Sequence, residues 1–122
     1  MEEKQQKSRS YRDLNVWKLS IELVKSVYRI TQKFPTSEIY SLTSQIRRAS
    51  ISIPANIAEG QGRASSKEFR QFLGIALGSL AELETQLIIA NEIDYMTSLE
   101  LEHFQSSIDT IRKMTKSLAK NL

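Results

Sequence analysis

Residues 69 to 90 carry the feature that most constrains the fold, an apolar repeat that alternates steps of four and three positions without a slip. Only an α-helix places positions at this spacing on one face, so the repeat predicts one long helix. Ser65 and Glu68 have the spacing of a capping box, and the helix is therefore expected to span residues 66–94. The positions of the repeat are Phe69, Leu73, Ala76, Leu80, Leu83, Leu87 and Ala90.

Three further segments show similar periodicity and predict helices over residues 14–33, 38–60 and 98–121. Pro35 ends the first of them, because the residue before a proline avoids the α region. Thr97 opens a second capping box at the start of the last. Only short segments separate the predicted helices, and no strand pattern competes with them.

The helix over residues 38–60 contains Pro54, which lacks a backbone donor and clashes with the preceding turn. We expect a kinked but continuous helix, and two shorter helices broken near Ser52 are the alternative. Gly60 and Gly62 are expected to supply a left-handed exit at its end.

A chain of 122 residues is long enough for one core that buries about two-thirds of its unfolded surface. Short connections force neighbouring helices to run in opposite directions. The predicted fold is therefore all-α, an antiparallel up-down-up-down four-helix bundle over residues 13–122. Residues 1–12 are expected to form a basic, flexible arm that carries Lys4, Lys7, Arg9 and Arg12.

Composition narrows the classes of function. The chain has no cysteine, which excludes disulfides, thiolate metal sites and thiol nucleophiles. No apolar run approaches the roughly 20 residues that span a bilayer, and the acidic start of the chain does not resemble a secretory signal. These features favour a cytoplasmic protein with no membrane partner.

Catalytic and metal-binding patterns are missing from the sequence. Glu100-x-x-His103 matches half of a di-iron carboxylate motif, but such a site needs two of these motifs and two further glutamates, and the chain has one histidine. There is no glycine-rich phosphate loop and no serine with a histidine base. We therefore expect no enzymatic activity, no metal and no cofactor.

The charged residues are distributed unevenly. Between Arg70 and Arg112 the chain has no lysine or arginine but seven acidic residues. In the predicted bundle the basic residues gather at the end that holds both termini, which favours contact with nucleic acid or with an acidic protein. The alternative is that these residues complement helix dipoles and solubilise the surface. The candidates for contact with nucleic acid are Arg12, Arg63, Lys67, Arg70, Arg112, Lys113, Lys116 and Lys120.

Arg47 and Arg48 flank the apolar stripe of their helix. One interpretation is an ion pair with a carboxylate of a neighbouring helix or subunit, such as Glu82 or Glu84. The other is contact with phosphate.

A second stripe of small residues follows the long helix, one position out of phase with the core repeat. Small residues let another helix approach closely, either inside the protomer or across a subunit interface. We favour the subunit interface, because the core already has its own stripe. The candidate interface residues are Gly74, Gly78, Ala81, Ile88 and Ile89.

Five segments together resemble a known bacterial family of four-helix proteins. They are residues 11–17 (YRDLNVW), 45–49 (QIRRA), 52–60 (SIPANIAEG), 62–63 (GR) and 78–87 (GSLAELETQL). The family includes proteins encoded in intervening sequences of the 23S ribosomal RNA gene and is also described as ribosomal-protein-like. The resemblance spans about residues 11 to 120, in order and at the expected spacings.

The resemblance implies a ring-like homo-oligomer, a barrel of five four-helix protomers. It also implies a more distant similarity to accessory proteins of diversity-generating retroelements, which are basic pentamers that work with a reverse transcriptase. It brings no catalytic residues. We therefore predict a non-catalytic homo-oligomeric protein that binds RNA or single-stranded DNA through its basic end. The alternative is a scaffold or accessory subunit of a nucleic-acid enzyme such as a reverse transcriptase.

Overall fold

The computed structural model describes residues 10–122, and over that range it contains four long α-helices, two short 3₁₀ turns and no strand. The prediction of an all-α chain with four helices is confirmed. The largest difference lies before the second helix, where residues 36–38 form a separate 3₁₀ turn. The elements are η1 (Tyr11–Asp13), α2 (Asn15–Thr31), η2 (Thr36–Glu38), α3 (Leu42–Gln61), α4 (Ser66–Glu92) and α5 (Ser98–Lys120).

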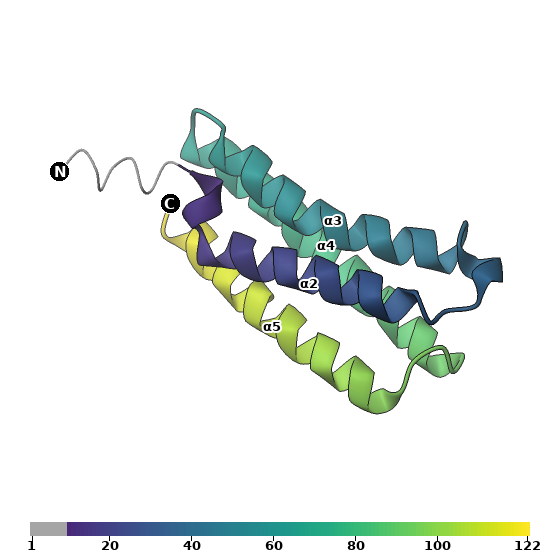
Figure 1. The fold of residues 1–122 in the computed structure, drawn as a ribbon. Coiled ribbons are helices and arrows are strands. Elements are labelled where there is room, and N and C mark those ends of the chain that lie inside the picture. The colour runs from purple at the N-terminus through teal and green to yellow at the C-terminus, as the bar shows by residue number, and fades with distance from the viewer. Residues whose placement is uncertain (1–9) are drawn as a thin grey trace.

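The four helices lie side by side, and their connections alternate between the two ends of the molecule (Figure 1). The start of α2, the α3–α4 connection and the end of α5 share one end, which we call the terminal end. The other two connections lie at the opposite end. Packing is most extensive between α3 and α4 and much weaker between α2 and α5.

The predicted repeat of α4 forms the centre of the core. Six of its seven positions are fully buried, and only Phe69 is half-buried. Apolar side chains from the other three helices complete a single cluster around it. Burial of these side chains supplies the main stabilising term for the fold. The largest fully buried contributors outside α4 are Val27, Ile46, Ile53, Ile57, Ile108 and Ile111.

Gly60 lets α3 and α4 approach closely near their connection. A Cβ atom at Gly60 would lie 2.7 Å from the Cβ of Phe72 and 2.9 Å from Cδ1 of Phe69. The predicted left-handed exit is wrong, because neither Gly60 nor Gly62 has a positive φ and Gly62 closes the helix at φ −80°. The glycine at position 60 is required by space and not by backbone conformation.

Pro54 lies inside α3, which runs without interruption from Leu42 to Gln61. The continuous helix is therefore confirmed over the alternative of a break near Ser52. Pro54 is buried against the core. The hydroxyl of Ser52 forms a hydrogen bond between α3 and α4. The hydroxyls of Ser52 and Ser79 are 2.8 Å apart, which links α3 to α4.

The chain before α2 is more ordered than the sequence predicts. The Ser10 hydroxyl accepts a hydrogen bond from the backbone N–H of Arg12 and caps η1. The ring of Tyr11 lies edge-on to Trp17, with centroids 5.2 Å apart. The predicted flexible arm therefore cannot extend through residue 12. Its first nine residues, with Lys4, Lys7 and Arg9, lie outside the described residues.

Candidate nucleic-acid and subunit interfaces

Three lysines line the outer face of α5 at the terminal end. Lys113, Lys116 and Lys120 are separated by steps of three and four, which return to the same side of a helix. All three are exposed and form no ion pair or hydrogen bond with the described residues. Their charges are therefore free to meet a ligand.

Lys67 and Arg70 extend this surface across the start of α4. Lys67 is exposed and forms no ion pair within the part of the chain that the structure describes. Arg70 donates from Nη1 to the carbonyl oxygen of Leu122 at 3.1 Å. That bond brings the start of α4 beside the end of α5. We call Lys67, Arg70, Lys113, Lys116 and Lys120 the basic patch.

Arg63, which the sequence suggests as a contact for nucleic acid, forms ion pairs within its own protomer. Its guanidinium is 2.7 Å from Oε2 of Glu59 and 3.9 Å from Oε1 of Glu68, and it lies over the ring of Phe72. Arg63 thus holds the α3–α4 connection and neutralises two nearby carboxylates. Exposed pairs of this kind contribute little stability, but they occupy the cation.

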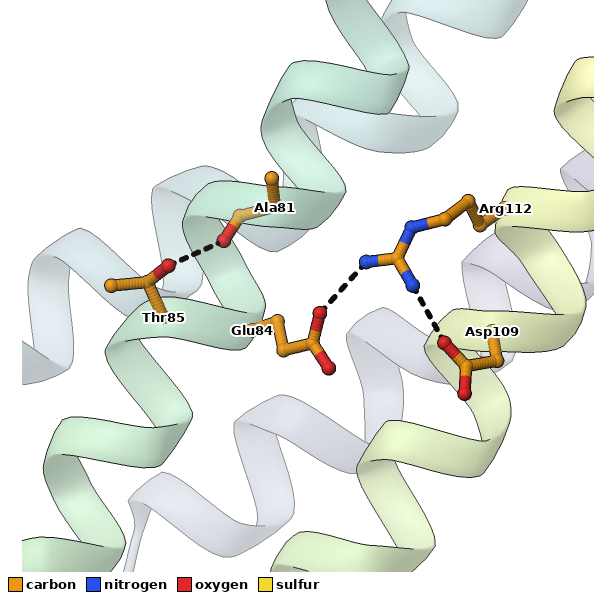
Figure 2. Close-up of polar contacts among 5 residues, drawn as sticks. All are labelled: Ala81, Glu84, Thr85, Asp109 and Arg112. Atoms are coloured by element: carbon orange, nitrogen blue, oxygen red, sulfur yellow. Dashed lines mark hydrogen bonds and ion pairs between the residues drawn. The ribbon is translucent and has the colours of Figure 1, made fainter.

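Arg112 is engaged in the same way between helices (Figure 2). Its Nη2 donates to Glu84 of α4 at 2.7 Å and its Nη1 to Asp109 at 2.6 Å, with the arginine side chain only 25% exposed. This fork ties α5 to α4. Arg112 lies next to the basic patch but adds no free charge to it.

Two further candidate arginines lie over aromatic rings of their own protomer. Arg12 is exposed and lies 5.9 Å from the centroid of the Tyr11 ring. Arg47 donates from Nε to Oγ1 of Thr31 at 2.9 Å and lies over the ring of Tyr28 at 4.5 Å. Its cation is thus anchored between α2 and α3.

Arg48 is exposed and lines a small depression with Glu82, without an ion pair among the described residues. Neither Arg47 nor Arg48 pairs with Glu82 or Glu84 of its own chain, so that form of the ion-pair prediction is wrong. Glu84 instead binds Arg112.

The small-residue stripe of α4 faces outward. A Cβ atom built at Gly74 or Gly78 would meet nothing within 4 Å, and Ala81 and Thr85 are exposed. Tight packing inside the protomer therefore does not explain these glycines. Isoleucines extend the face, because Ile88 is 39% exposed and Ile89 45%. We call Gly74, Gly78, Ala81, Thr85, Ile88 and Ile89 the outer face of α4.

By length and composition alone, α4 is apolar enough to cross a membrane, although only 39% of its most apolar 18-residue window is buried in the fold. The core helix of a soluble protein can have the same length and apolar composition, so this is weak support for a membrane role. A helix that is apolar around most of its circumference usually becomes buried on all sides. In this protomer α4 is covered on its core side only.

A long groove separates α2 from α5, as their weak packing requires. Three depressions follow it, with volumes of about 830, 300 and 460 Å³. Leu23, Ile30, Phe104 and Ile111 line two of them, and Leu99 projects at one rim with 77% exposure. We call this feature the α2–α5 groove.

Titratable groups with shifted pKa values lie at the opposite end of the molecule. The Tyr95 hydroxyl donates to Oε2 of Glu38 at 2.8 Å, which lowers the pKa of Glu38 and raises that of Tyr95. This bond fastens η2 to the α4–α5 connection. Over residues 10–122 no three His, Cys, Asp or Glu side chains converge as metal ligands, and His103 lies on the rim of the α2–α5 groove.

A family model and a solved structure relate this chain to one kind of protein. A family model described as 23S rRNA-intervening sequence protein matches residues 12–117. The crystal structure of a protein of unknown function from the S23 ribosomal protein family of Bacteroides thetaiotaomicron has a TM-score of 0.80 and 26% sequence identity, covering 86% of this chain and 95% of that one. A search of curated proteins gives no match.

Proposed function

The chain belongs to the 23S rRNA-intervening sequence protein family, and from this premise we propose that it is a non-catalytic, homo-oligomeric protein that binds RNA or single-stranded DNA. The basic patch is the binding surface, and the cytoplasm is the expected compartment. The outer face of α4 is the proposed contact between copies.

The observation that carries this proposal is the division of charges at the terminal end. The carboxylates of Glu59, Glu68 and Asp109 are already held by Arg63 and Arg112. Among residues 10–122 the lysines of the patch have no such partner. A cluster of uncompensated cations attracts phosphates and releases their condensed counterions on binding, which is the main source of affinity for nucleic acid without sequence preference.

Self-association strengthens this function. The family resemblance implies a ring of five protomers, and a ring with aligned protomers places every basic patch on the same rim. A nucleic-acid strand that meets several patches at once binds more tightly than one patch allows, because each later contact forms at a high effective concentration. Weak individual patches thus suffice for useful affinity.

The test is the binding of labelled structured RNA and single-stranded DNA, measured by fluorescence anisotropy. If about five phosphates are neutralised, affinity for a single strand is expected to fall about a hundredfold between about 50 and 200 mM salt. Lys116→Glu with Lys120→Glu removes two patch charges without breaking an ion pair and should abolish binding at the higher salt concentration. The solution mass of each variant shows whether the oligomer persists.

The matched control is Lys18→Glu with Lys25→Glu, which makes the same change in net charge outside the patch. Both lysines are exposed on α2, and neither lines the α2–α5 groove. Binding should survive in this control. An equal loss in both variants would show that only overall charge matters, and no binding at low salt would redirect the search to an acidic protein partner.

A further inference from the structure

We propose that the outer face of α4 in one copy of the chain packs into the α2–α5 groove of the next copy. This inference rests on the self-association proposed above, and it names the two surfaces that meet. Each surface is apolar and uncovered in the protomer, and a single contact repeated between copies covers both.

The outer face of α4 can be approached closely by another helix. Gly74 and Gly78 carry no side chain, and the space above them is open. A groove between two helices accepts a third helix most closely where that helix carries small residues. Leu23, Ile30 and Ile111 line the groove but are at most 8% exposed, so the apolar side chains that a neighbouring helix would meet first are Leu19 and Leu99.

Exposed apolar side chains on both surfaces favour the same contact. Ile88 and Ile89 remain 39% and 45% exposed on α4, and Leu19 and Leu99 remain 40% and 77% exposed along the groove. Contiguous apolar surface of this kind marks a protein interface in a soluble protein. At about 25 cal/mol per Å² of apolar area, its burial drives association.

One unpaired cation favours a parallel direction of the copies, although the same part of the groove also holds Glu102 and the Lys33–Glu100 ion pair. Arg29 lines the groove at the end opposite the terminal end, and it has no ion pair or hydrogen bond with the described residues. Glu92 and Asp94 lie at the end of α4, at that same end of the molecule, and are likewise exposed and unpaired. Parallel copies bring Arg29 of one protomer to the level of these two carboxylates in the next.

The proposed contact is heterologous, because α4 meets a different surface on its neighbour. Such contacts form closed rings when the rotation between copies closes and filaments when it does not. Parallel copies around an axis along the helices also place all basic patches at one rim, as the proposed binding of nucleic acid requires. A face-to-face pairing of two α4 helices would instead give a closed dimer and leave the groove empty.

Engineered cysteines test the contact cleanly, because the chain contains no cysteine. Thr85 lies on the outer face of α4 and Ser107 lines the groove. The double variant Thr85→Cys/Ser107→Cys, treated with a short bis-maleimide, should give a ladder of linked chains beyond the dimer. A mixture of the two single variants should give dimers, and neither single variant alone should cross-link.

Two results would overturn the inference while leaving self-association intact. One is efficient cross-linking of Thr85→Cys alone, which means that two α4 faces meet. The other is an uncross-linked double variant in a protein whose solution mass is a multiple of the chain. A monomeric mass at micromolar concentration overturns the homo-oligomer as well. Ala55, exposed on α3, gives the control pair Thr85→Cys/Ala55→Cys, which should form no ladder.

Gly78→Gln provides an independent measurement. The added side chain meets nothing within the protomer, and glutamine favours a helix more than glycine does. The variant should therefore keep its helical circular dichroism and lose the oligomer at micromolar concentration. An oligomer of unchanged mass would show that Gly78 is not in the contact.

Discussion

At the scale of single residues, glycine serves opposite purposes in this chain. Gly60 is buried where the side chains of Phe69 and Phe72 leave no room for a methyl group. Gly74 lies within α4, where an added Cβ atom would meet nothing within 4 Å. The first glycine is required by the fold of one protomer, whereas the second weakens its helix and needs another explanation.

Alanine at these two positions should change stability in opposite directions. Gly60→Ala forces its Cβ against the Cβ of Phe72, an overpacking that costs about 1–3 kcal/mol. Gly74→Ala meets nothing and should raise the free energy of unfolding of the protomer by about 0.5–1 kcal/mol. Urea titration followed by circular dichroism measures both, and equal effects of the two variants would contradict this assignment.

The sequence predicts which basic residues lie near one another, but not which of them are free. Arg63 and Lys67 belong to the same predicted cluster, yet Arg63 is held by two glutamates and Lys67 is not. Arg112 reaches Glu84, 28 positions away in the sequence. A long side chain selects its partner by three-dimensional reach, which spacing along one helix does not encode.

At the scale of elements, periodicity and capping predict the helices well. Ser65 accepts the backbone N–H of Glu68 at the start of α4, as its spacing indicates. The capping box at Thr97 is complete, with both reciprocal hydrogen bonds formed. The ends of helices are less predictable. Gly60, at the end of α3, serves close packing and not a left-handed turn. A positive φ of 67° occurs after α4, at Asp94, which is not a glycine.

Thr97→Ala should destabilise the protein by about 1 kcal/mol, because it leaves the first backbone donors of α5 without their acceptor. Thr110→Ala is the control, since Thr110 is exposed within α5 and bonds only to the carbonyl of Ser106. Thermal unfolding of both variants measures the difference. A cost for Thr110→Ala as large as for Thr97→Ala would argue against the cap.

The same capping box makes stability depend on acid. The backbone N–H of Thr97 donates to the carboxylate of Glu100, and Lys33 lies nearby, so the pKa of Glu100 is lowered. A carboxylate with a lowered pKa stabilises the fold at pH values above its ordinary pKa of about 4.3. This stability is lost as the pH falls through the lowered pKa. Glu100→Gln should therefore cost stability at neutral pH, and this cost should shrink as the pH falls through the lowered pKa of Glu100. A gap between the two proteins that stays constant with pH would contradict the role of this charge.

At the scale of the whole molecule, uncovered apolar surface runs along the bundle and the basic patch lies at one end of it, where Lys113 also lines the α2–α5 groove. The outer face of α4 and the α2–α5 groove lie along its length, and the basic patch lies at the terminal end. The sequence indicated both the outward stripe and the basic end. It could not predict the groove, because the weak packing of α2 against α5 depends on how all four helices settle around one core.

The midpoint of thermal unfolding, Tm, should rise with protein concentration, because association stabilises only the folded chain. Scanning fluorimetry at about 1 and 100 µM measures the shift in Tm. The underlying change in stabilisation free energy scales with RT ln of the concentration ratio. Gly78→Gln should remove this dependence. A wild-type Tm that is independent of concentration, together with a monomeric mass, would contradict the assembly.

The position of Leu122 at the terminal end has a practical consequence for anyone who handles this protein (Figure 1). A purification tag or a reporter fused after Leu122 is tethered beside Arg70 of the basic patch. A histidine tag adds titratable charge there, and an acidic fusion partner competes directly with phosphate. A reporter inserted beside Tyr40, which is 95% exposed in the α2–α3 connection, lies at the far end of the molecule and leaves the patch open.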